Sequence, residues 1–334
     1  MKRKPFAAVL LAAVLLAPAA ALPARIVIGG KAVVMVADAA YAFPQAKDRV
    51  VAIAGVDQGL GAFLAAIDPG FPAKPALDRA AGAEAYAAQR PDLVVLKSAM
   101  RKSLGPSLDA LGIKQLYLDL ETPEDYLKDI ASLGEAFGDP GRAAAVIDYY
   151  RSALAAVAAK VDSLPAAERP RVLVLQAGAA GGYELPPASW MQTILAERAG
   201  GTAVWKGANP GSGWAKVGLE QIAAWNPEAV FVVSYREPST AVAARLAADT
   251  ALASVAAVRS GKIFGFPQDF YSWDQPDTRW VLGLEWMAKK LHPERFAGLS
   301  IMAETQRFFA FMYGMDATRF SGLVAPRLAG DHGD

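Results

Sequence analysis

Short apolar runs alternate with helix-like segments along most of the chain. Runs of four or five mostly apolar residues occur at 49–53, 93–96 and 115–118, and again at 171–175, 230–233 and 262–266. Continuous apolar runs of this length, bounded by turn residues or helical spacing, are typical of strands that are buried on both faces. The pattern therefore predicts an α/β fold with mostly parallel sheets.

The segment 25–36 shows a different pattern. Two short apolar stretches flank Gly29 and Gly30. A Gly-Gly pair between two apolar stretches is a signature of a tight two-residue turn. We therefore expect a β-hairpin at the start of the folded chain.

One long helix is expected in the middle of the chain. Asp139 suits the N-cap position and Pro140 the first helical position, and apolar residues recur with helical spacing from 143 to 161. We therefore expect two Rossmann-like α/β lobes, at 25–138 and 165–334, linked by a single long helix within 139–164. Amphipathic helices at 281–290 and 301–313 are expected to complete the second lobe.

The first 24 residues have the composition of a cleavable secretory signal peptide. Three cations at positions 2–4 precede an apolar run at 6–16 and small residues at 17–21. An uncleaved membrane anchor is the alternative, but the run is shorter than the roughly 20 residues that a span needs. Because the chain has no cysteine, a lipoprotein anchor is excluded. A free protein of the periplasm is expected.

The composition excludes several classes of protein. Without cysteine the chain cannot form disulfides, iron–sulfur clusters or thiolate zinc sites. With only two histidines, a histidine-rich metal centre or a Ser-His-Asp triad is hard to assemble. The 34 Lys and Arg against 33 Asp and Glu give a formal net charge of +1, which provides no basic field for nucleic acid. No cofactor is expected.

One motif occurs twice, once in each predicted lobe. Residues 82–94 and 218–230 share the pattern G-x-E-x-x-A-A-x-x-P-[DE]-x-V at a constant offset of 136 positions. The pattern predicts a short helix, a proline-containing stop and a buried strand. The helix dipole favours an acid near a helix start, but it does not explain why both copies have glutamate, at Glu84 and Glu220. Equivalent glutamates on two lobes suit a two-point docking surface.

The loops that follow the predicted strands are the candidate ligand site, because ligands of open α/β sheets bind beyond the carboxyl ends of the strands. Aromatic side chains in these loops offer flat apolar walls, and cations there can pair with anionic ligands. Taken singly, each such residue could instead belong to the core, as is expected for Trp205, Trp225, Trp280 and Trp286. The candidate ligand-binding residues are Lys97, Trp190, Trp214, Tyr235, Arg236, Tyr271, Trp273 and Arg279.

Segments along essentially the whole mature chain are similar to those of one known family. They are 48–52, 84–95, 138–140, 220–233, 261–264 and a group of motifs between 272 and 314. They resemble the substrate-binding proteins of ABC importers for iron chelates, haem and vitamin B12, which are class III periplasmic binding proteins with two lobes joined by one helix. The resemblance implies that Glu84 and Glu220 dock onto arginines of a membrane permease. It also implies that the rigid helix permits only small lobe movement.

The resemblance implies a monomeric receptor and not an enzyme. It would capture a metal chelate, namely a ferric siderophore, haem or a corrinoid, and deliver it to an ABC permease. An oxyanion such as molybdate or tungstate is the alternative ligand, which Lys97 or Arg236 could serve. A secreted enzyme is a further alternative, in which Asp269 and Asp274 would act as acid and base.

Overall fold

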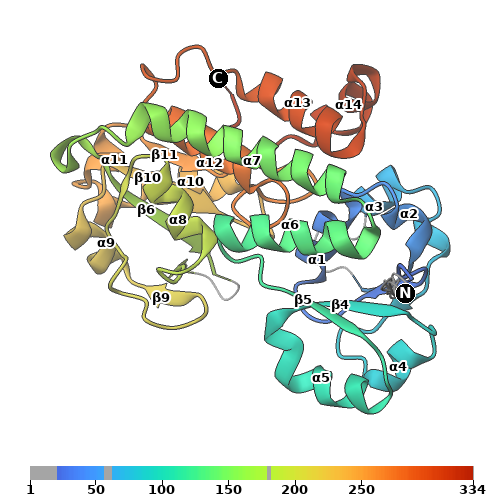
Figure 1. Ribbon diagram of the computed structural model, residues 1–334. Coiled ribbons are helices and arrows are strands. Elements are labelled where there is room, and N and C mark those ends of the chain that lie inside the picture. Colours follow the sequence, from blue (N-terminus) through green and yellow to red (C-terminus); the bar gives the residue numbers. More distant parts are fainter. Residues whose placement is uncertain (1–20, 56–61, 179–181, 334) are drawn as a thin grey trace, which may run out of the picture.

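The computed structural model describes residues 21–55, 62–178 and 182–333. Two α/β units lie side by side, and one long helix lies across both of them (Figure 1). The first 20 residues of the predicted signal peptide lie outside the described residues. Among the residues that are described, no helix is both long and apolar enough to cross a membrane.

The first unit is built on a five-stranded sheet in which all neighbouring strands are parallel. The spatial order is β3-β2-β1-β4-β5, so the direction in which strands are added reverses between β1 and β4. In open α/β sheets such a reversal opens a crevice at the carboxyl ends of the two strands, where ligands bind. The strands are β1 (Ile26–Ile28), β2 (Val50–Ala54), β3 (Ala76–Leu77), β4 (Leu93–Lys97) and β5 (Gln115–Leu118).

Helices connect these strands and cover the first sheet. The best capped is α6, where the hydroxyl of Thr122 accepts a hydrogen bond from the backbone N–H of Asp125 at 3.0 Å and Gly138 ends the helix in the left-handed region. The helices are α1 (Val33–Tyr41), α2 (Ala46–Arg49), α3 (Ala62–Ile67), α4 (Ala83–Ala87), α5 (Arg101–Ala110) and α6 (Pro123–Phe137), with 3₁₀ turns η2 (Phe71–Ala73) and η3 (Ser98–Met100).

The prediction of a hairpin at 25–36 is wrong, because β1 is followed by helix α1. Strand β1 pairs with β2 on one edge and with β4 on the other, so neither edge is open to an antiparallel partner. Apart from Asp38, α1 is apolar and almost wholly buried. Its sequence therefore lacks the polar stripe that marks a helix with one face toward solvent. The glycines allow close packing instead: the Tyr86 hydroxyl accepts a bond from the Gly30 N–H at 2.9 Å and fills the space that a side chain at Gly29 would need.

The second unit has a six-stranded sheet with a parallel centre and an antiparallel edge. Strand β6 lies parallel to β8 and β10, and β10 lies parallel to β11. Strands β7 and β9 extend the sheet in antiparallel fashion from the carboxyl end of β6. The strands are β6 (Arg171–Ala177), β7 (Tyr183–Leu185), β8 (Thr202–Ala203), β9 (Ala215–Val217), β10 (Ala229–Val233) and β11 (Ile263–Gly265).

The last helices of the chain return to the first unit. The ring of Phe63 on α3 lies 4.8 Å from that of Tyr313 on α13, and Arg319 on α14 donates to the carbonyl of Ala66. The helices after β6 are α8 (Met191–Arg198), α9 (Leu219–Trp225), α10 (Ser239–Ala248), α11 (Ala256–Arg259), α12 (Trp280–Leu291), α13 (Ile301–Tyr313) and α14 (Ala317–Leu323), with 3₁₀ turns η4 (Ala166–Glu168), η5 (Thr250–Leu252) and η6 (Ala325–Arg327).

The long helix α7 (Pro140–Val161) connects the two units. The carboxylate of Asp139 accepts a hydrogen bond from the backbone N–H of Arg142 at 2.9 Å and so caps the helix. Its 22 residues span about 33 Å at 1.5 Å per residue. It packs on α6 of the first unit and on α12 of the second. The prediction of two α/β lobes joined by a single long helix is confirmed.

The repeated motif folds in the same way in both units. Each copy forms a short helix, α4 or α9, after an extended glycine, and then a central strand, β4 or β10. The equivalent residues Arg90 and Asn226 both adopt the left-handed region, with φ of 49° and 44°. In each unit an arginine next to or at the start of the adjacent strand, Arg25 or Arg171, donates to a carbonyl just after or at the end of the short helix.

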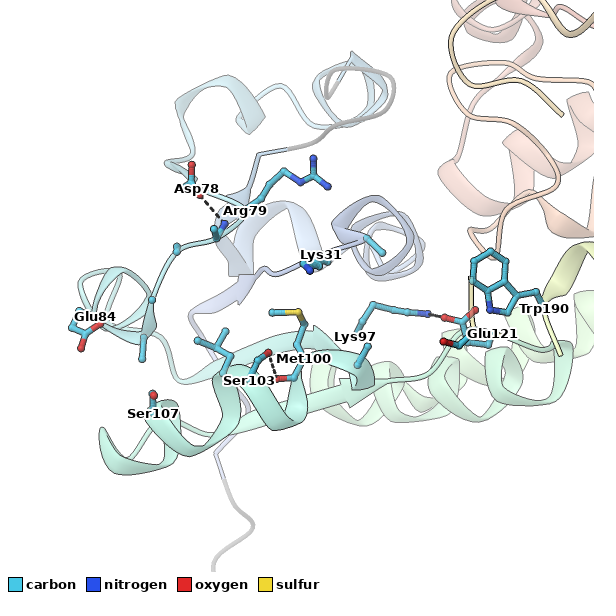
Figure 2. Close-up of a pocket in the computed structure, with 18 residues that line it drawn as sticks. Lys31, Asp78, Arg79, Glu84, Lys97, Met100, Ser103, Ser107, Glu121 and Trp190 are labelled. Carbon is cyan, nitrogen blue, oxygen red and sulfur yellow. Dashed lines mark hydrogen bonds and ion pairs between the residues drawn. The ribbon is translucent and has the colours of Figure 1, made fainter. Parts of the chain in front are cut away.

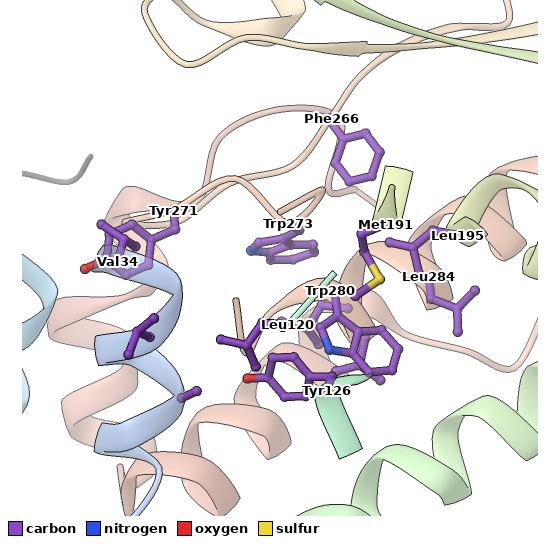
Figure 3. Packing of buried hydrophobic residues seen from close by; sticks show 14 of the residues in the cluster. Val34, Leu120, Tyr126, Met191, Leu195, Phe266, Tyr271, Trp273, Trp280 and Leu284 are labelled. Atoms are coloured by element: carbon purple, nitrogen blue, oxygen red, sulfur yellow. The ribbon is translucent and has the colours of Figure 1, made fainter. Parts of the chain in front are cut away.

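A single hydrophobic core runs through both units. Figure 3 shows Val34 of α1 and Tyr126 of α6 in the same cluster as Trp280 and Leu284 of α12. Trp205, Trp280 and Trp286 are fully buried, as predicted, whereas Trp225 is half-buried.

Candidate functional site

Loops from both sheets meet at a cleft between the two units. From the first unit, Lys31 follows β1 and Lys97 ends β4, so both lie at the carboxyl ends of the strands where the strand order reverses. From the second unit, Tyr235 follows β10, and Trp190 and Trp214 precede α8 and β9. This is the position at which ligands bind in open α/β sheets.

The larger part of the cleft is a cavity of about 880 Å³, most of whose walls belong to the first unit. Figure 2 shows Lys97 reaching Glu121 beside the indole of Trp190, while Glu84 lies at the opposite end. Its charged lining residues are three cations and three acids: Lys31, Arg79, Lys97, Asp78, Glu84 and Glu121.

A smaller cavity of about 230 Å³ lies toward the second unit. It shares Ala32, Glu121 and Trp190 with the larger one, so the two cavities are parts of one cleft. Its remaining lining residues are mostly apolar or uncharged: Met35, Gln192, Trp214, Tyr235, Gln275 and Pro276.

An aromatic wall forms the side of the cleft that belongs to the second unit. The rings of Trp190 and Trp214 meet edge to face, with centroids 5.7 Å apart and planes at 86°. Such pairs are more stable than area burial alone predicts. Tyr235 lines the same small cavity. The wall offers flat apolar surface to a ligand of organic size.

Lys97 is already paired in the structure. Its ammonium lies 2.6 Å from the Glu121 carboxylate and also donates to the carbonyl of Asp119. The lysine side chain is 6% exposed, whereas that of Glu121 is 42% exposed. A ligand in the cleft therefore meets the glutamate before the lysine, and an anion would compete with Glu121 for the ammonium.

Asp274 supports the aromatic wall from behind. Its carboxylate Oδ2 accepts hydrogen bonds from Gln192 Nε2 at 2.8 Å and from the Tyr235 hydroxyl at 2.7 Å. Burial raises the pKa of Asp274, although hydrogen bonds from Ser272, Tyr235 and Gln192 act in the opposite direction. Burial also holds the pKa of Tyr235 well above its usual value. Two side chains of the cleft are thereby fixed in orientation.

Three of the predicted ligand-binding residues, Tyr271, Trp273 and Arg279, are buried away from the cleft. Arg279 donates to the Asp269 carboxylate at 2.7 and 2.9 Å and to Asp38 of α1 at 2.7 Å. The Trp273 indole N–H also donates to Asp269, at 2.8 Å. The guanidinium lies 4.8 Å from the ring of Tyr271. These contacts join the two units and leave none of the three side chains facing a ligand.

The carboxylates considered for acid–base chemistry are likewise engaged. Asp269 is paired with Arg279, and Asp274 is fully buried beneath Tyr235. Among the described residues, no group of three or more His, Asp or Glu side chains could hold a metal ion. Neither Asp269 nor Asp274 lines the cavities of the cleft, so neither carboxylate is placed to act on a ligand there.

A comparison with protein families decides which family this is. Residues 23–270, more than half of the chain, match the family described as periplasmic binding protein. The chain belongs to the periplasmic binding protein family.

One relative is named for the ligand that it binds. A segment of 102 residues is 30% identical to the molybdate-binding protein MolA of Haemophilus influenzae, and this segment spans 30% of the chain and 28% of the length of MolA. The solved structure of MolA with molybdate matches with a TM-score of 0.71 at 18% identity, over 89% of this chain and 95% of that one.

Two further solved structures have the same fold. A periplasmic solute binding protein of Veillonella parvula matches with a TM-score of 0.73 at 20% identity, over 91% of this chain and 92% of that one. Helicobacter pylori CeuE with Ni(II) bound matches with a TM-score of 0.69 at 17% identity, over 90% of this chain and 94% of that one. The predicted resemblance to periplasmic substrate-binding proteins is confirmed at the level of family and fold.

The structure brings together four of the eight predicted ligand-binding residues of this periplasmic binding protein: Lys97, Trp190, Trp214 and Tyr235. Arg236 is exposed and does not line either cavity of the cleft, and its role stays a prediction. Sequence reasoning missed Lys31, because the hairpin interpretation hid the loop after β1. It also missed Glu121, which follows β5, and Gln192 and Gln275, which adjoin predicted residues.

The repeated glutamates occupy equivalent places at the surface. Glu84 and Glu220 are both exposed, each in the first turn of its helix. Each carboxylate folds back over the helix start, with Oε2 3.1 Å and 3.0 Å from where a Cβ would stand on the preceding Gly82 and Gly218. The two units therefore present the same acidic feature.

Proposed function

We propose that this periplasmic binding protein captures a metal chelate in its cleft and delivers it, chemically unchanged, to the permease of an ABC importer. Ferric siderophores, haem and corrinoids are the candidate ligands. The receptor would act as a monomer in the periplasm, after removal of the signal peptide expected at residues 1–24.

The size and walls of the cleft support a ligand of organic size. The larger of its two connected cavities, about 880 Å³, falls within the range of small-molecule sites, and the smaller one adds about 230 Å³. A tetrahedral oxyanion takes the room of three or four waters, roughly 100 Å³ at about 30 Å³ per water. The aromatic wall of Trp190, Trp214 and Tyr235 would contact the organic shell of a chelate and would have no role toward a bare oxyanion.

An oxyanion remains the second candidate ligand, because the relative MolA is named for molybdate. The cations Lys31 and Lys97 at the ends of β1 and β4 are the residues that would bind it. In that case the ligand would have to displace Glu121 from Lys97.

A fluorescence titration distinguishes the two ligand classes. Ligand-stripped protein is titrated with a ferric trihydroxamate, a ferric tricatecholate, haem, cobalamin, molybdate and tungstate, with correction for light absorbed by coloured ligands. Saturable quenching by a chelate is expected, and it should be largely lost in Trp190→Phe but kept in Trp225→Phe, since Trp225 lies outside the cleft. Binding of oxyanions alone would refute the proposal of a chelate.

The same receptor is proposed to dock through Glu84 and Glu220. Both carboxylates are exposed at equivalent positions of the two units, so they could contact equivalent cations on a two-part permease. The double variant Glu84→Arg/Glu220→Arg should abolish uptake in cells that carry the cognate permease. Because Glu220 lines neither cavity of the cleft, Glu220→Arg alone should impair uptake while ligand affinity stays unchanged. Glu168→Arg, an exposed glutamate on η4, is the matched control. Normal uptake by the double variant would refute the docking assignment.

A further inference from the structure

Three aromatic rings line the smaller cavity of the cleft. Trp190 and Trp214 meet edge to face, with planes at 86° and centroids 5.7 Å apart, and Tyr235 provides the third ring. All three residues are half-buried, so part of each side chain remains accessible. Two perpendicular indoles form a corner bounded by two aromatic faces. The face of an aromatic ring is electronegative and attracts cations, and the face of an indole attracts them most strongly.

One acid accompanies these rings. Among the described residues that line the smaller cavity, Glu121 alone is charged, and Figure 2 shows it beside the indole of Trp190. Its side chain is 42% exposed, whereas that of its partner Lys97 is 6% exposed. Lys97 donates to Oε1 of the carboxylate, and no donor of the described chain reaches Oε2. The negative end of this ion pair is therefore the end that a ligand meets.

The cations of the cleft lie outside the smaller cavity. Lys31, Arg79 and Lys97 line the larger cavity, and none of them is among the described residues that line the smaller one. Arg236 lines neither. An anion in the smaller cavity would therefore face Glu121 without a counterion in the walls. A cation there would meet aromatic faces and a carboxylate, both of which attract it.

The room and the remaining walls suit a quaternary ammonium group. A trimethylammonium group takes the room of about four waters, roughly 120 Å³ at about 30 Å³ per water, and the smaller cavity holds about 230 Å³. Its methyl groups can pack on the apolar lining residues Ala32, Met35 and Pro276. Because a quaternary nitrogen has no N–H, an apolar lining leaves no donor of the ligand without a partner.

We propose that the smaller cavity is a subsite for a quaternary ammonium group, held by the faces of Trp190 and Trp214 and by the carboxylate of Glu121. The inference rests on the proposed function, because the group would belong to the receptor's ligand. It would be a substituent on the organic shell of a chelate whose body fills the larger cavity. Among chelates of similar size, the subsite selects those with a cationic end.

The first test compares two small probes that differ in charge. Ligand-free wild-type protein is titrated in a calorimeter with choline, and with its neutral tert-butyl analogue, in which carbon replaces the charged nitrogen. Choline should bind saturably at up to millimolar concentration, and the analogue should bind at least tenfold more weakly, because only the cation is attracted to the rings and the carboxylate. Equal affinity for the two probes, or no binding of choline, would overturn the inference even if a chelate binds. Binding of choline without binding of any chelate would support the subsite and refute the chelate proposal.

The second test uses variants of the lining residues. Trp214→Phe should weaken choline binding a few-fold and Trp214→Leu about tenfold, because a phenyl face attracts cations less than an indole face and leucine has no such face. Glu121→Gln should weaken choline binding about tenfold and leave binding of the tert-butyl analogue unchanged. Trp225→Leu and Glu168→Gln, both outside the cleft, are the matched controls and should change nothing. Wild-type affinity for choline in Trp214→Leu or in Glu121→Gln would contradict the assignment. The comparison of the two probes uses wild-type protein, so it does not depend on the folding of any variant.

Discussion

Arg279→Met tests whether the buried ion pairs hold the two units together. In the structure the guanidinium bridges Asp38 of α1 and Asp269 of the segment after β11, and all three side chains are buried. Burial alone would lower the pKa of Arg279, but Asp269 and Asp38 hold it well above its usual value. Methionine keeps most of the volume and removes the charge, so both carboxylates are left buried without a counterion.

The magnitude follows from the cost of breaking a buried pair, about 3–5 kcal/mol. Hydrogen bonds that remain at Asp38, from Tyr313 at 2.8 Å, and at Asp269, from Trp273 at 2.8 Å, favour the lower end of this range. At about 2–4 °C per kcal/mol for a chain of this size, the melting temperature should fall by roughly 6–12 °C at pH 7. Thermal unfolding followed by circular dichroism measures this directly.

Two further results decide the cause. The loss of stability of Arg279→Met relative to wild type should shrink toward pH 5, because carboxyl groups buried without a counterion have raised pKa values and can become neutral. The triple variant Asp38→Asn/Asp269→Asn/Arg279→Met also removes the charge of both carboxylates that pair with Arg279, and it should recover most of the lost stability. The reasoning fails if Arg279→Met lies within 1 °C of wild type, or if the triple variant is no more stable than the single one.

Two other predictions concern stability. Burial raises the pKa of Glu285 on α12 to about 8, from its usual 4.5. The folded state therefore holds a proton that the unfolded chain releases, and stability falls as pH rises from about 4.5 to 8, by up to ~1.4 kcal/mol per pH unit. Glu285→Gln should flatten this dependence in denaturant titrations and be more stable than wild type at pH 8.5; the opposite order would contradict it. Gly29→Ala should cost about 1–3 kcal/mol in the same assay, because the methyl group overlaps the Tyr86 ring, whereas Gly207→Ala, with open space around it, should cost nothing. Equal stability of the two alanine variants would remove this explanation.

Much of the fold was predictable because its strands are short, buried and clearly bounded. The runs predicted at 115–118 and 301–313 have the same bounds in the structure, as β5 and α13. The helix at α1 was not predictable from its pattern, since a buried apolar helix and a buried strand both appear as continuous apolar runs. Only the pairing of β1 on both edges excludes the hairpin, and pairing is a property of the whole sheet.

The site was predictable only in part, for a similar reason. Lys97 ends the central strand β4 and Tyr235 follows the central strand β10, so strand positions alone place them at the cleft. Arg279 also lies in a loop region rich in aromatics, but its partner Asp38 is 241 positions away in the chain. No local pattern indicates that this arginine faces inward.

The connection between the two units has a consequence for transport. They are joined by α7, by the Arg279 pairs and by the return of α13 to α3, so large opening would break buried charge pairs as well as apolar contacts. We therefore expect a protein built in this way to keep nearly the same outline whether empty or loaded. If Glu84 and Glu220 dock it to a permease, empty molecules would occupy the transporter as readily as full ones. Transport would then follow the loaded fraction of receptor, and overproduction of the receptor at low ligand supply would slow uptake.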